Sequence, residues 1–348
     1  MTDAVTTGLR RGAVQCGGAA VLFGAATPAA SALGEHLSPF VLAGILYLGA
    51  AAAMLPIARR QPLDRTAARA GASRLGIAVL FGGMIGPVLL MFALDRAPAS
   101  TVSLLLNLEV VFTVALAAAF FHEHLGPRVV AGMLAVACAG GVLGWTNDVD
   151  LRVGALLAAC ACAAWAIDNT TTANLDSFTP QQITLAKGAV AGAVNLTIGL
   201  STQGRFDAGA AVIALGVGAV GYGASISMWI SGARLLGAAR GQLIFAVAPF
   251  VGAALSWAAL DDPVHTRSVL AIALATAGVL MVLRSSHDHA HRHESLEHDH
   301  EHRHDDGHHT HDHGDADAVA ERHSHRHRHA ATEHRHPHVP DLHHRHQH

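Results

Sequence analysis

Long apolar segments constrain this sequence more than any other feature. The clearest lies within residues 93–126, ALDRAPASTVSLLLNLEVVFTVALAAAFFHEHLG, where the long apolar run carries one internal carboxylate, Glu109, and could cross a bilayer. The chain before the polar tail divides into ten such segments, which we place at residues 12–33, 38–57, 75–94, 100–121, 128–146, 153–173, 182–202, 210–231, 241–260 and 267–284. The sequence therefore predicts an all-α integral membrane protein with ten transmembrane helices.

The composition agrees with helices that pack closely in lipid. The chain is 51% apolar and 14% charged, and it contains 35 glycines but few aromatic residues. Small residues allow membrane helices to approach one another closely. All four cysteines fall in apolar segments, which favours a packing role over a disulfide framework.

The two halves of the apolar region are related in sequence. A shift of 140 residues lays Ala97 on Gly237 and Glu109 on Pro249. Each half holds five segments, and because five is odd, the second half is expected to enter the membrane with the opposite orientation. Inverted repeats predict alternating access around a site near the bilayer midplane. We divide the chain into an N-terminus, a first repeat, a second repeat and a tail, at residues 1–11, 12–146, 153–284 and 285–348.

Basic residues in the short loops predict the orientation. Five arginines separate the second and third segments, and two more precede the first segment: Arg59, Arg60, Arg65, Arg69, Arg74, Arg10 and Arg11. Positive loops are retained in the cytoplasm. We therefore predict a multi-pass protein of the plasma (cytoplasmic) membrane, the inner membrane of a cell that has two, with both termini and the tail in the cytoplasm.

Particular motifs resemble a known family. The first half contains ASTVSLLLNLEVVFTVALAA, the acidic exit HEHLG and the glycine-bearing GMLAVACAGGVLGW, and the second half contains ARLLGAARGQLIFAVAPFVGAALSW and ATAGVLMVL. This pattern resembles the EamA-type transporters of the drug/metabolite transporter (DMT) superfamily over most of residues 12–284. The resemblance implies two inverted five-helix EamA repeats and secondary transport of small molecules, frequently export.

Two positions depart from the family pattern. Family members usually carry proline where this first repeat has Glu109, and glutamate where the second repeat has Asp262, whereas Pro249 and Glu123 match. These departures leave the substrate class and the coupling ion open.

The charged residues at membrane depth are the strongest functional candidates, because an ionisable group there is costly and usually faces a cavity or a partner. Glu109 lies halfway along its segment and is our first candidate for proton coupling or for binding a cationic substrate. The alternative is a neutral glutamic acid that is hydrogen-bonded to a neighbouring helix.

Asp168 and Lys187 form a second candidate pair. They lie at similar depths in consecutive segments, which a short connection would make antiparallel neighbours, so an ion pair is expected. Lys187 is the only lysine in the chain. Two interpretations stand at this point: a structural salt bridge, and an ion pair that a substrate carboxylate or a proton separates during transport.

Uncharged polar residues and one proline complete the candidate site. The amides at Asn107, Asn169 and Asn195 could contact substrate or hydrogen-bond between helices. Pro249 would interrupt its helix and free backbone carbonyls at the position that mirrors Glu109.

The tail predicts different chemistry. All but four of the 27 histidines lie after residue 285, interleaved with charged residues and without the apolar residues of a core, so we predict a disordered tail. Neutral imidazoles beside carboxylates suit Zn, Ni, Co or Cu(II), and we expect divalent Zn, Ni or Co. The predicted ligands are His287, His289, His291, His293, His298, His300, His302, His304, His308, His309, His311, His313, His323, His325, His327 and His329.

We therefore predict a secondary transporter, an exporter of a small metabolite, whose tail buffers or senses divalent transition metal. The alternatives are a Ni, Co or Zn carrier fed by the tail, and a membrane-anchored metal store or sensor without transport. We expect no enzyme activity, no cofactor required for transport and no nucleic-acid partner. The expected partners are the lipid bilayer, a small-molecule substrate and divalent metal ions, and we expect a monomer or a homodimer.

Overall fold

The structure is a computed structural model. It describes residues 2–63, 65–121, 126–172, 175, 177–202, 204–236, 238–283 and, in the tail, 287–293, 297–302, 323–328 and 332–338. The contacts divide the chain into two units, residues 1–285 with 340–345 and residues 286–339 with 346–348.

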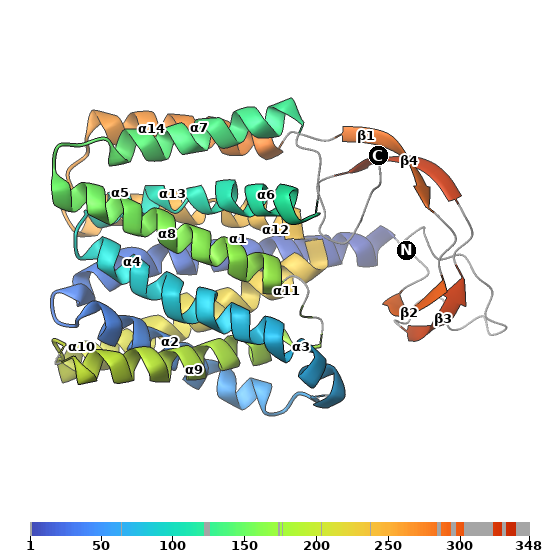
Figure 1. Ribbon diagram of the computed structural model, residues 1–348, viewed down its shortest axis with the longest axis horizontal. Coiled ribbons are helices and arrows are strands. Elements are labelled where there is room, and N and C mark those ends of the chain that lie inside the picture. Colours follow the sequence, from blue (N-terminus) through green and yellow to red (C-terminus); the bar gives the residue numbers. More distant parts are fainter. Residues whose placement is uncertain are drawn as a thin grey trace. The chain divides into compact units, whose positions relative to one another are not determined.

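The first half of the helical unit contains five helical spans (Figure 1). Its elements are α1 (Thr2–Gly34), α2 (Pro39–Ala58), α3 (Arg65–Ala78), the π-helix η1 (Val79–Ile85), α4 (Gly86–Leu94), α5 (Ala99–Leu105), α6 (Leu108–Phe121) and α7 (Pro127–Gly144). The third span is α3, η1 and α4 in succession, and the fourth is α5 followed by α6. Each overlaps a predicted segment, but α1 and the third span begin ten residues earlier than the predicted starts at residues 12 and 75.

The second half repeats this order. Its elements are α8 (Val149–Thr172), α9 (Pro180–Ser201), α10 (Ala208–Val217), the π-helix η2 (Gly218–Ala224), α11 (Ser225–Leu236), α12 (Ala238–Phe245), α13 (Ala248–Ala259) and α14 (Thr266–Leu283). Within the described residues, eight helical runs have the length and hydropathy of membrane spans, and α13 and α14 are shorter apolar helices. With α12 and α13 taken as one interrupted span, the described helices match all ten predicted segments.

Interruptions occur at equivalent places in the two halves. The α5–α6 break falls at residues 106–107, and the 140-residue shift carries it onto the α12–α13 break at residues 246–247. The π-helices η1 and η2 likewise occupy corresponding positions in the third span of each half. The internal repeat is therefore visible in the backbone as well as in the sequence.

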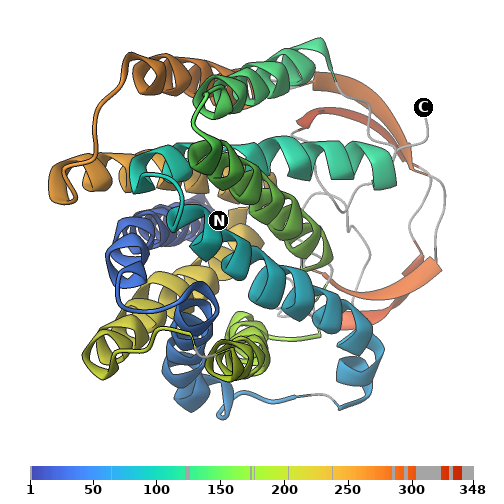
Figure 2. The same cartoon turned by 60° about the vertical axis from the view of Figure 1, so that its left-hand side comes forward.

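Glycine contacts hold the two halves together. The helices α2 and α9, the second span of each half, pack against one another. A Cβ on Gly188 would lie 2.6 Å from the Tyr47 carbonyl oxygen, so this close approach requires glycine. At the edge of the unit α7 packs chiefly against α14 (Figure 2), and here a Cβ on Gly132 would lie 2.6 Å from the carbonyl oxygen of Gly278. The last span of each half is thus paired with the other.

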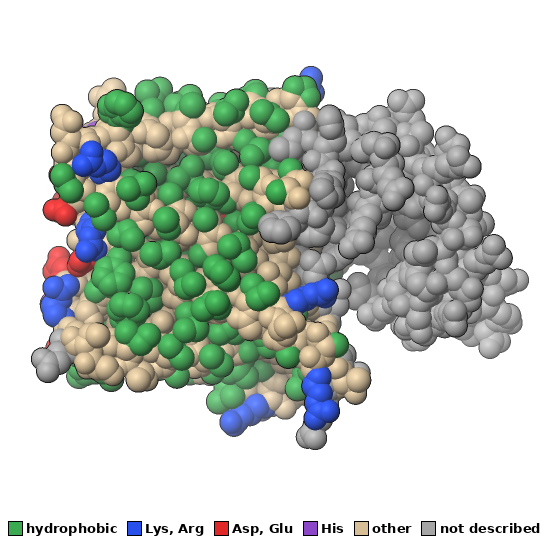
Figure 3. Space-filling model, in the orientation of Figure 1, with side chains coloured by type: hydrophobic (Ala, Val, Ile, Leu, Met, Phe, Trp, Pro, Cys, Tyr) green, Lys and Arg blue, Asp and Glu red, His purple; other side chains and the backbone are tan. Residues whose placement is uncertain are grey.

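The surface of the helical unit is consistent with a lipid environment. In Figure 3 hydrophobic side chains cover the helices, and the charged side chains lie at the two ends of the unit. Many large apolar side chains are exposed on these helices, such as Val14, Leu134, Leu156, Val212 and Val269. In water such a surface would be unfavourable, whereas in a bilayer it is the expected outer layer.

The tail contains short paired strands. The strand β1 (His287–His293) pairs with β4 (Thr332–His338), and β2 (Glu297–His302) pairs with β3 (His323–Arg328), both antiparallel. The alternating sequence suits a strand, and backbone pairing does not require an apolar core. The rest of the tail lies outside the described residues.

Candidate substrate and coupling site

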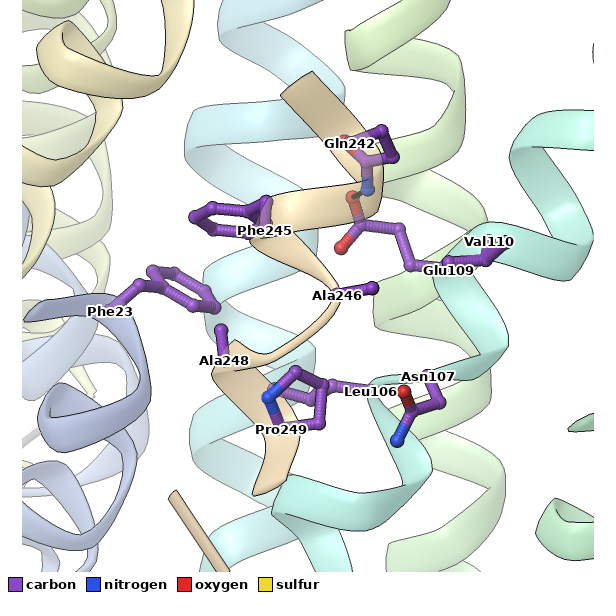
Figure 4. Close-up of a pocket in the computed structure, with 10 residues that line it drawn as sticks. All are labelled: Phe23, Leu106, Asn107, Glu109, Val110, Gln242, Phe245, Ala246, Ala248 and Pro249. Atoms are coloured by element: carbon purple, nitrogen blue, oxygen red, sulfur yellow. Dashed lines mark hydrogen bonds between the residues drawn. The ribbon is translucent and has the colours of Figure 1, made fainter. Parts of the chain in front are cut away.

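The two helix breaks line a common cavity in the helical unit (Figure 4). It measures about 20 Å³, which is room for about one water molecule. Its lining residues are Phe23, Leu106, Asn107, Glu109, Val110, Gln242, Phe245, Ala246, Ala248 and Pro249. Glu109 and Pro249, which the repeat places at equivalent positions, therefore face the same space.

The α12–α13 break has a direct cause in Pro249. Proline has no N–H to donate to the carbonyl of Phe245, four residues earlier, and its ring crowds that carbonyl. The chain instead makes bonds that span three residues, as in a 3₁₀ turn: from Val247 N to Ile244 O at 3.3 Å and from Phe250 N to Val247 O at 3.1 Å.

The α5–α6 break forms without proline. Asn107 donates from Nδ2 to the carbonyl of Leu104 at 3.0 Å, and the Cys162 thiol of α8 lies 3.7 Å from the carbonyl of Leu105 and 3.8 Å from that of Leu106. The carbonyls of Leu104 and Leu106 also accept backbone bonds, from Asn107 N at 3.3 Å and from Glu109 N at 3.1 Å, so the side chains add donors to a break whose backbone is already partly bonded. Asn107 is buried, and its Oδ1 is without a partner in the described structure. The break therefore leaves an acceptor free at the cavity.

Glu109 is held by donors from the second half of the chain. Its Oε1 accepts a hydrogen bond from Asn169 Nδ2 of α8 at 2.6 Å and a longer one from Gln242 Nε2 of α12 at 3.4 Å. Both donors are neutral amides, and in the described part of the chain no basic side chain pairs with Glu109. Sequence reasoning missed Gln242, although its polar side chain in an apolar segment was a usable signal.

The ion pair of Asp168 and Lys187 is present. Lys187 Nζ lies 2.6 Å from the Asp168 carboxylate, both side chains are buried, and Thr172 donates to Asp168 Oδ1 at 2.9 Å. Our geometric reason was wrong, however, because η1 lies between α8 and α9 and packs against both. The Asp168 carboxylate lies against Gly82 of η1, and a Cβ added to Gly82 would overlap it. Glycine at this position is what lets the two side chains meet.

The backbone of η1 takes further side-chain donors. The carbonyl of Gly82 accepts from Tyr47 Oη at 2.6 Å and from Trp165 Nε1 at 3.3 Å, and Asn195 Nδ2 lies 3.4 Å from the carbonyls of Gly83 and Met84. Asn195 thus binds backbone between helices, away from the cavity at Glu109.

The cavity wall on the side away from Glu109 is aromatic. The ring of Phe23 in α1 lies 5.5 Å from that of Phe245, 5.8 Å from that of Tyr222 and 6.0 Å from that of Trp165, measured between centroids. Figure 4 shows Phe23 and Phe245 on one side of the cavity and Glu109 on the other. A ligand here would meet an acid on one side and aromatic rings on the other.

The structure therefore brings some predicted site residues together and separates others. Asn107, Glu109 and Pro249 line the cavity, and Asn169 contacts Glu109, whereas Asp168 and Lys187 are outside the lining. In the described residues no three His, Cys, Asp or Glu side chains gather as a metal site. The side chains of all sixteen predicted tail ligands lie outside the described residues.

A second cavity of about 250 Å³ lies at the end of α1, α2 and α4. Glu35, Asp95 and Arg205 contribute its charged groups, and Arg205 bonds the carbonyl of Gly34 at 3.1 Å and Asp95 Oδ1 at 3.4 Å. Asp262 caps a neighbouring helix, accepting from the Ser100 N–H at the start of α5 at 2.8 Å. Its counterpart by repeat, Glu123, lies outside the described residues.

These features define a multi-pass membrane protein built from two repeats, with a polar site between interrupted helices. The sequence model of the EamA-like transporter family matches residues 10–144 and 152–284. The chain belongs to the EamA-like transporter family.

Similarity to solved structures supports the fold. One, described only as "Crystal structure of protein", has a TM-score of 0.58 and 21% sequence identity, and the match covers 77% of this chain and 97% of that one. Among proteins with curated functions, none matches this chain significantly.

Proposed function

We propose that this protein is a secondary transporter that exports a small metabolite, and that its substrate or coupling cation binds at Glu109. One observation carries the proposal: Glu109 at the repeat breaks is bonded by the neutral amides of Asn169 and Gln242, while the chain's single lysine is already paired with Asp168. Glu109 is partly buried, and a carboxylate withdrawn from bulk water is stabilised by a proton or by a nearby positive charge. A proton or a cationic group of the substrate would supply it.

The size of the cavity adds a constraint. About 20 Å³ admits a water molecule or a small ion, so an organic substrate can bind at Glu109 only after the surrounding half-helices move. Broken helices placed symmetrically in inverted repeats provide such a movement, because one half can rock against the other around the site. The proposal therefore predicts that substrate binding and helix movement occur together.

Transport by purified protein in proteoliposomes tests this function. Amines, amino acids and carboxylic acids would be offered one class at a time, with a trapped pH-sensitive dye reporting proton movement. Glu109→Gln keeps the shape and removes the charge, so we expect it to abolish the dependence of flux on a pH gradient. Unchanged gradient dependence in this variant, with wild-type flux present, would reject Glu109 as the coupling residue.

We further propose that the tail binds divalent Zn, Ni or Co and acts as a metal buffer or sensor on the cytoplasmic side. The alternation of histidine with acidic residues supports this, since neutral imidazole and carboxylate are suitable ligands for these ions. Isothermal titration of the full chain and of a chain lacking residues 285–348 tests it. Equal metal binding by the two proteins would reject the role of the tail.

The same truncated protein separates transport from storage. If it retains organic flux and loses only metal tolerance in cells, the membrane domain is the transporter and the tail is accessory. If metal flux is present in the full chain and lost on truncation, the protein is instead a metal carrier fed by the tail. If neither the full chain nor the truncated protein moves any solute, the function that fits is a membrane-anchored metal store or sensor without transport.

A further inference from the structure

Glu109 connects the two repeats directly. It belongs to the first repeat, whereas both of its donors, Asn169 in α8 and Gln242 in α12, belong to the second. Both donors bond the same oxygen, Oε1, and no donor to Oε2 is present among the described residues. A proton or a substrate cation can therefore reach Oε2 while the amides remain in place.

The two donors are anchored very differently. Asn169 follows Asp168, whose ion pair with Lys187 fixes α8 across Gly82, and its bond to Glu109 is short, at 2.6 Å. Gln242 lies on the eight-residue half-helix α12, which ends at a break, and its bond is long, at 3.4 Å. The contact with Gln242 is thus the weaker of the two and the one that a change at Glu109 breaks first.

A change at Glu109 alters the strength of both bonds. Hydrogen bonds to an ionised carboxylate are roughly twice as strong as those to a neutral carboxyl group. Neutralisation of Glu109, by a proton or by a bound cation, therefore weakens its hold on α12 while Asn169 stays in place. The α12 half-helix also begins the interrupted span whose break lines the cavity.

Resting on the proposed function, we propose that Gln242 transmits the occupancy of Glu109 to the second repeat. Gln242 holds α12 against α6 when the carboxylate is ionised, and it releases α12 when the carboxylate is neutralised. It is a positioning residue: Glu109 binds the proton or cation, and Gln242 couples that event to movement of the half-helix.

Hydrogen–deuterium exchange of the full-length protein in lipid nanodiscs measures this release. The readout is the exchange of residues 238–245 across a pH series, corrected for the intrinsic pH dependence of amide exchange. In the wild type we expect exchange to rise about tenfold on acidification, which corresponds to losing one charge-assisted hydrogen bond. Glu109→Gln and Gln242→Met should show the fast exchange at every pH.

Other groups near Glu109 must be separated from its effect. Asp168 is paired with Lys187, and the Cys162 thiol lies at the α5–α6 break. Cys162→Ser, and the double variant Asp168→Asn with Lys187→Met that leaves no unpaired charge, should each retain the acid-induced rise if Glu109 is the group that responds. A flat profile in either variant would assign the response elsewhere and overturn the proposal.

Two further variants guard against a folding artefact. Gln242→Asn keeps the amide but is shorter by one methylene, so it should behave as Gln242→Met. The matched control is Gln181→Met on α9, which removes a glutamine that bonds Ser227 Oγ at 3.0 Å in a separate network and should keep the wild-type profile. A flat wild-type profile, or an acid-induced rise that persists in either Gln242 variant, overturns the proposal.

The outcome is distinguishable from failure of the proposed function. Flux in proteoliposomes tests transport, whereas exchange in α12 tests coupling through Gln242. Gradient-dependent flux without the change in exchange would keep the transporter and reject Gln242 as its coupling residue.

Discussion

The ion pair between Asp168 and Lys187 gives the sharpest prediction of stability. The lysine nitrogen and the carboxylate are 2.6 Å apart, and the side chains of Lys187 and Asp168 are only 4% and 8% exposed. Removing one partner leaves the other charge buried and uncompensated, which costs about 3–5 kcal/mol. We therefore expect Asp168→Asn and Lys187→Met each to lower the free energy of unfolding by about this amount.

The double variant should be less destabilised than either single variant. With both charges gone no unpaired charge remains, and the amide oxygen that Asp168→Asn introduces can still accept from the Thr172 hydroxyl. The assay is reversible unfolding in mixed lipid–detergent micelles, followed by tryptophan fluorescence. The interaction energy from the double-mutant cycle should be several kcal/mol.

The exposed pair of Asp95 and Arg205 provides the matched control cycle. Its atoms are 3.4 Å apart and its side chains are 39% and 59% exposed, so the coupling should be at most about 1 kcal/mol. Additive losses at Asp168 and Lys187, with a coupling no larger than this control, would refute the argument that the pair is desolvated and mutually dependent.

Three other predictions follow from the same contacts. Gly82→Ala should disrupt the ion pair as strongly as Asp168→Asn does, because the added Cβ would overlap the Asp168 carboxylate, and unfolding of the two variants side by side checks this. Asp262→Ala should cost about 1 kcal/mol, because Ser100 loses its capping acceptor, whereas Asp262→Asn should retain most of it in the same assay. Zinc binding to residues 285–348 should weaken as the pH falls through about 6.5, because protons compete for the imidazoles, which bind metal only when neutral. Titration with zinc at several pH values measures this, and an affinity that does not change with pH would contradict it.

The helical spans and the repeat were predictable because the bilayer imposes a length on every segment. The same 140-residue shift that pairs Glu109 with Pro249 also superimposes the two helix breaks. The Asp168–Lys187 pair was predictable from matching depth, since unpaired charges at depth are costly. The length of a bilayer and the cost of an unpaired charge within it depend only on residue type and position in the chain, so the sequence is enough to predict these features.

The details of the site depended on packing that sequence patterns do not show. The insertion of η1 between α8 and α9 rests on Gly82, which is one glycine among 35 and is not distinguished by its neighbours. Asn195 was grouped with the site because of its depth, but its partners are backbone carbonyls of η1. To predict Gln242 as a partner of Glu109, one must know that α12 lies beside Glu109, and only the folded structure shows this.

The pairing of α7 with α14 has a consequence for how the chain is made. In synthesis from the N-terminus, α7 is complete long before α14, its chief packing partner, exists. The Gly132 face of α7 must therefore remain against lipid until the last span is inserted, when Gly278 can close on it. The first repeat is in this sense an unfinished folding unit, and the final membrane helix completes a structure begun well over a hundred residues earlier.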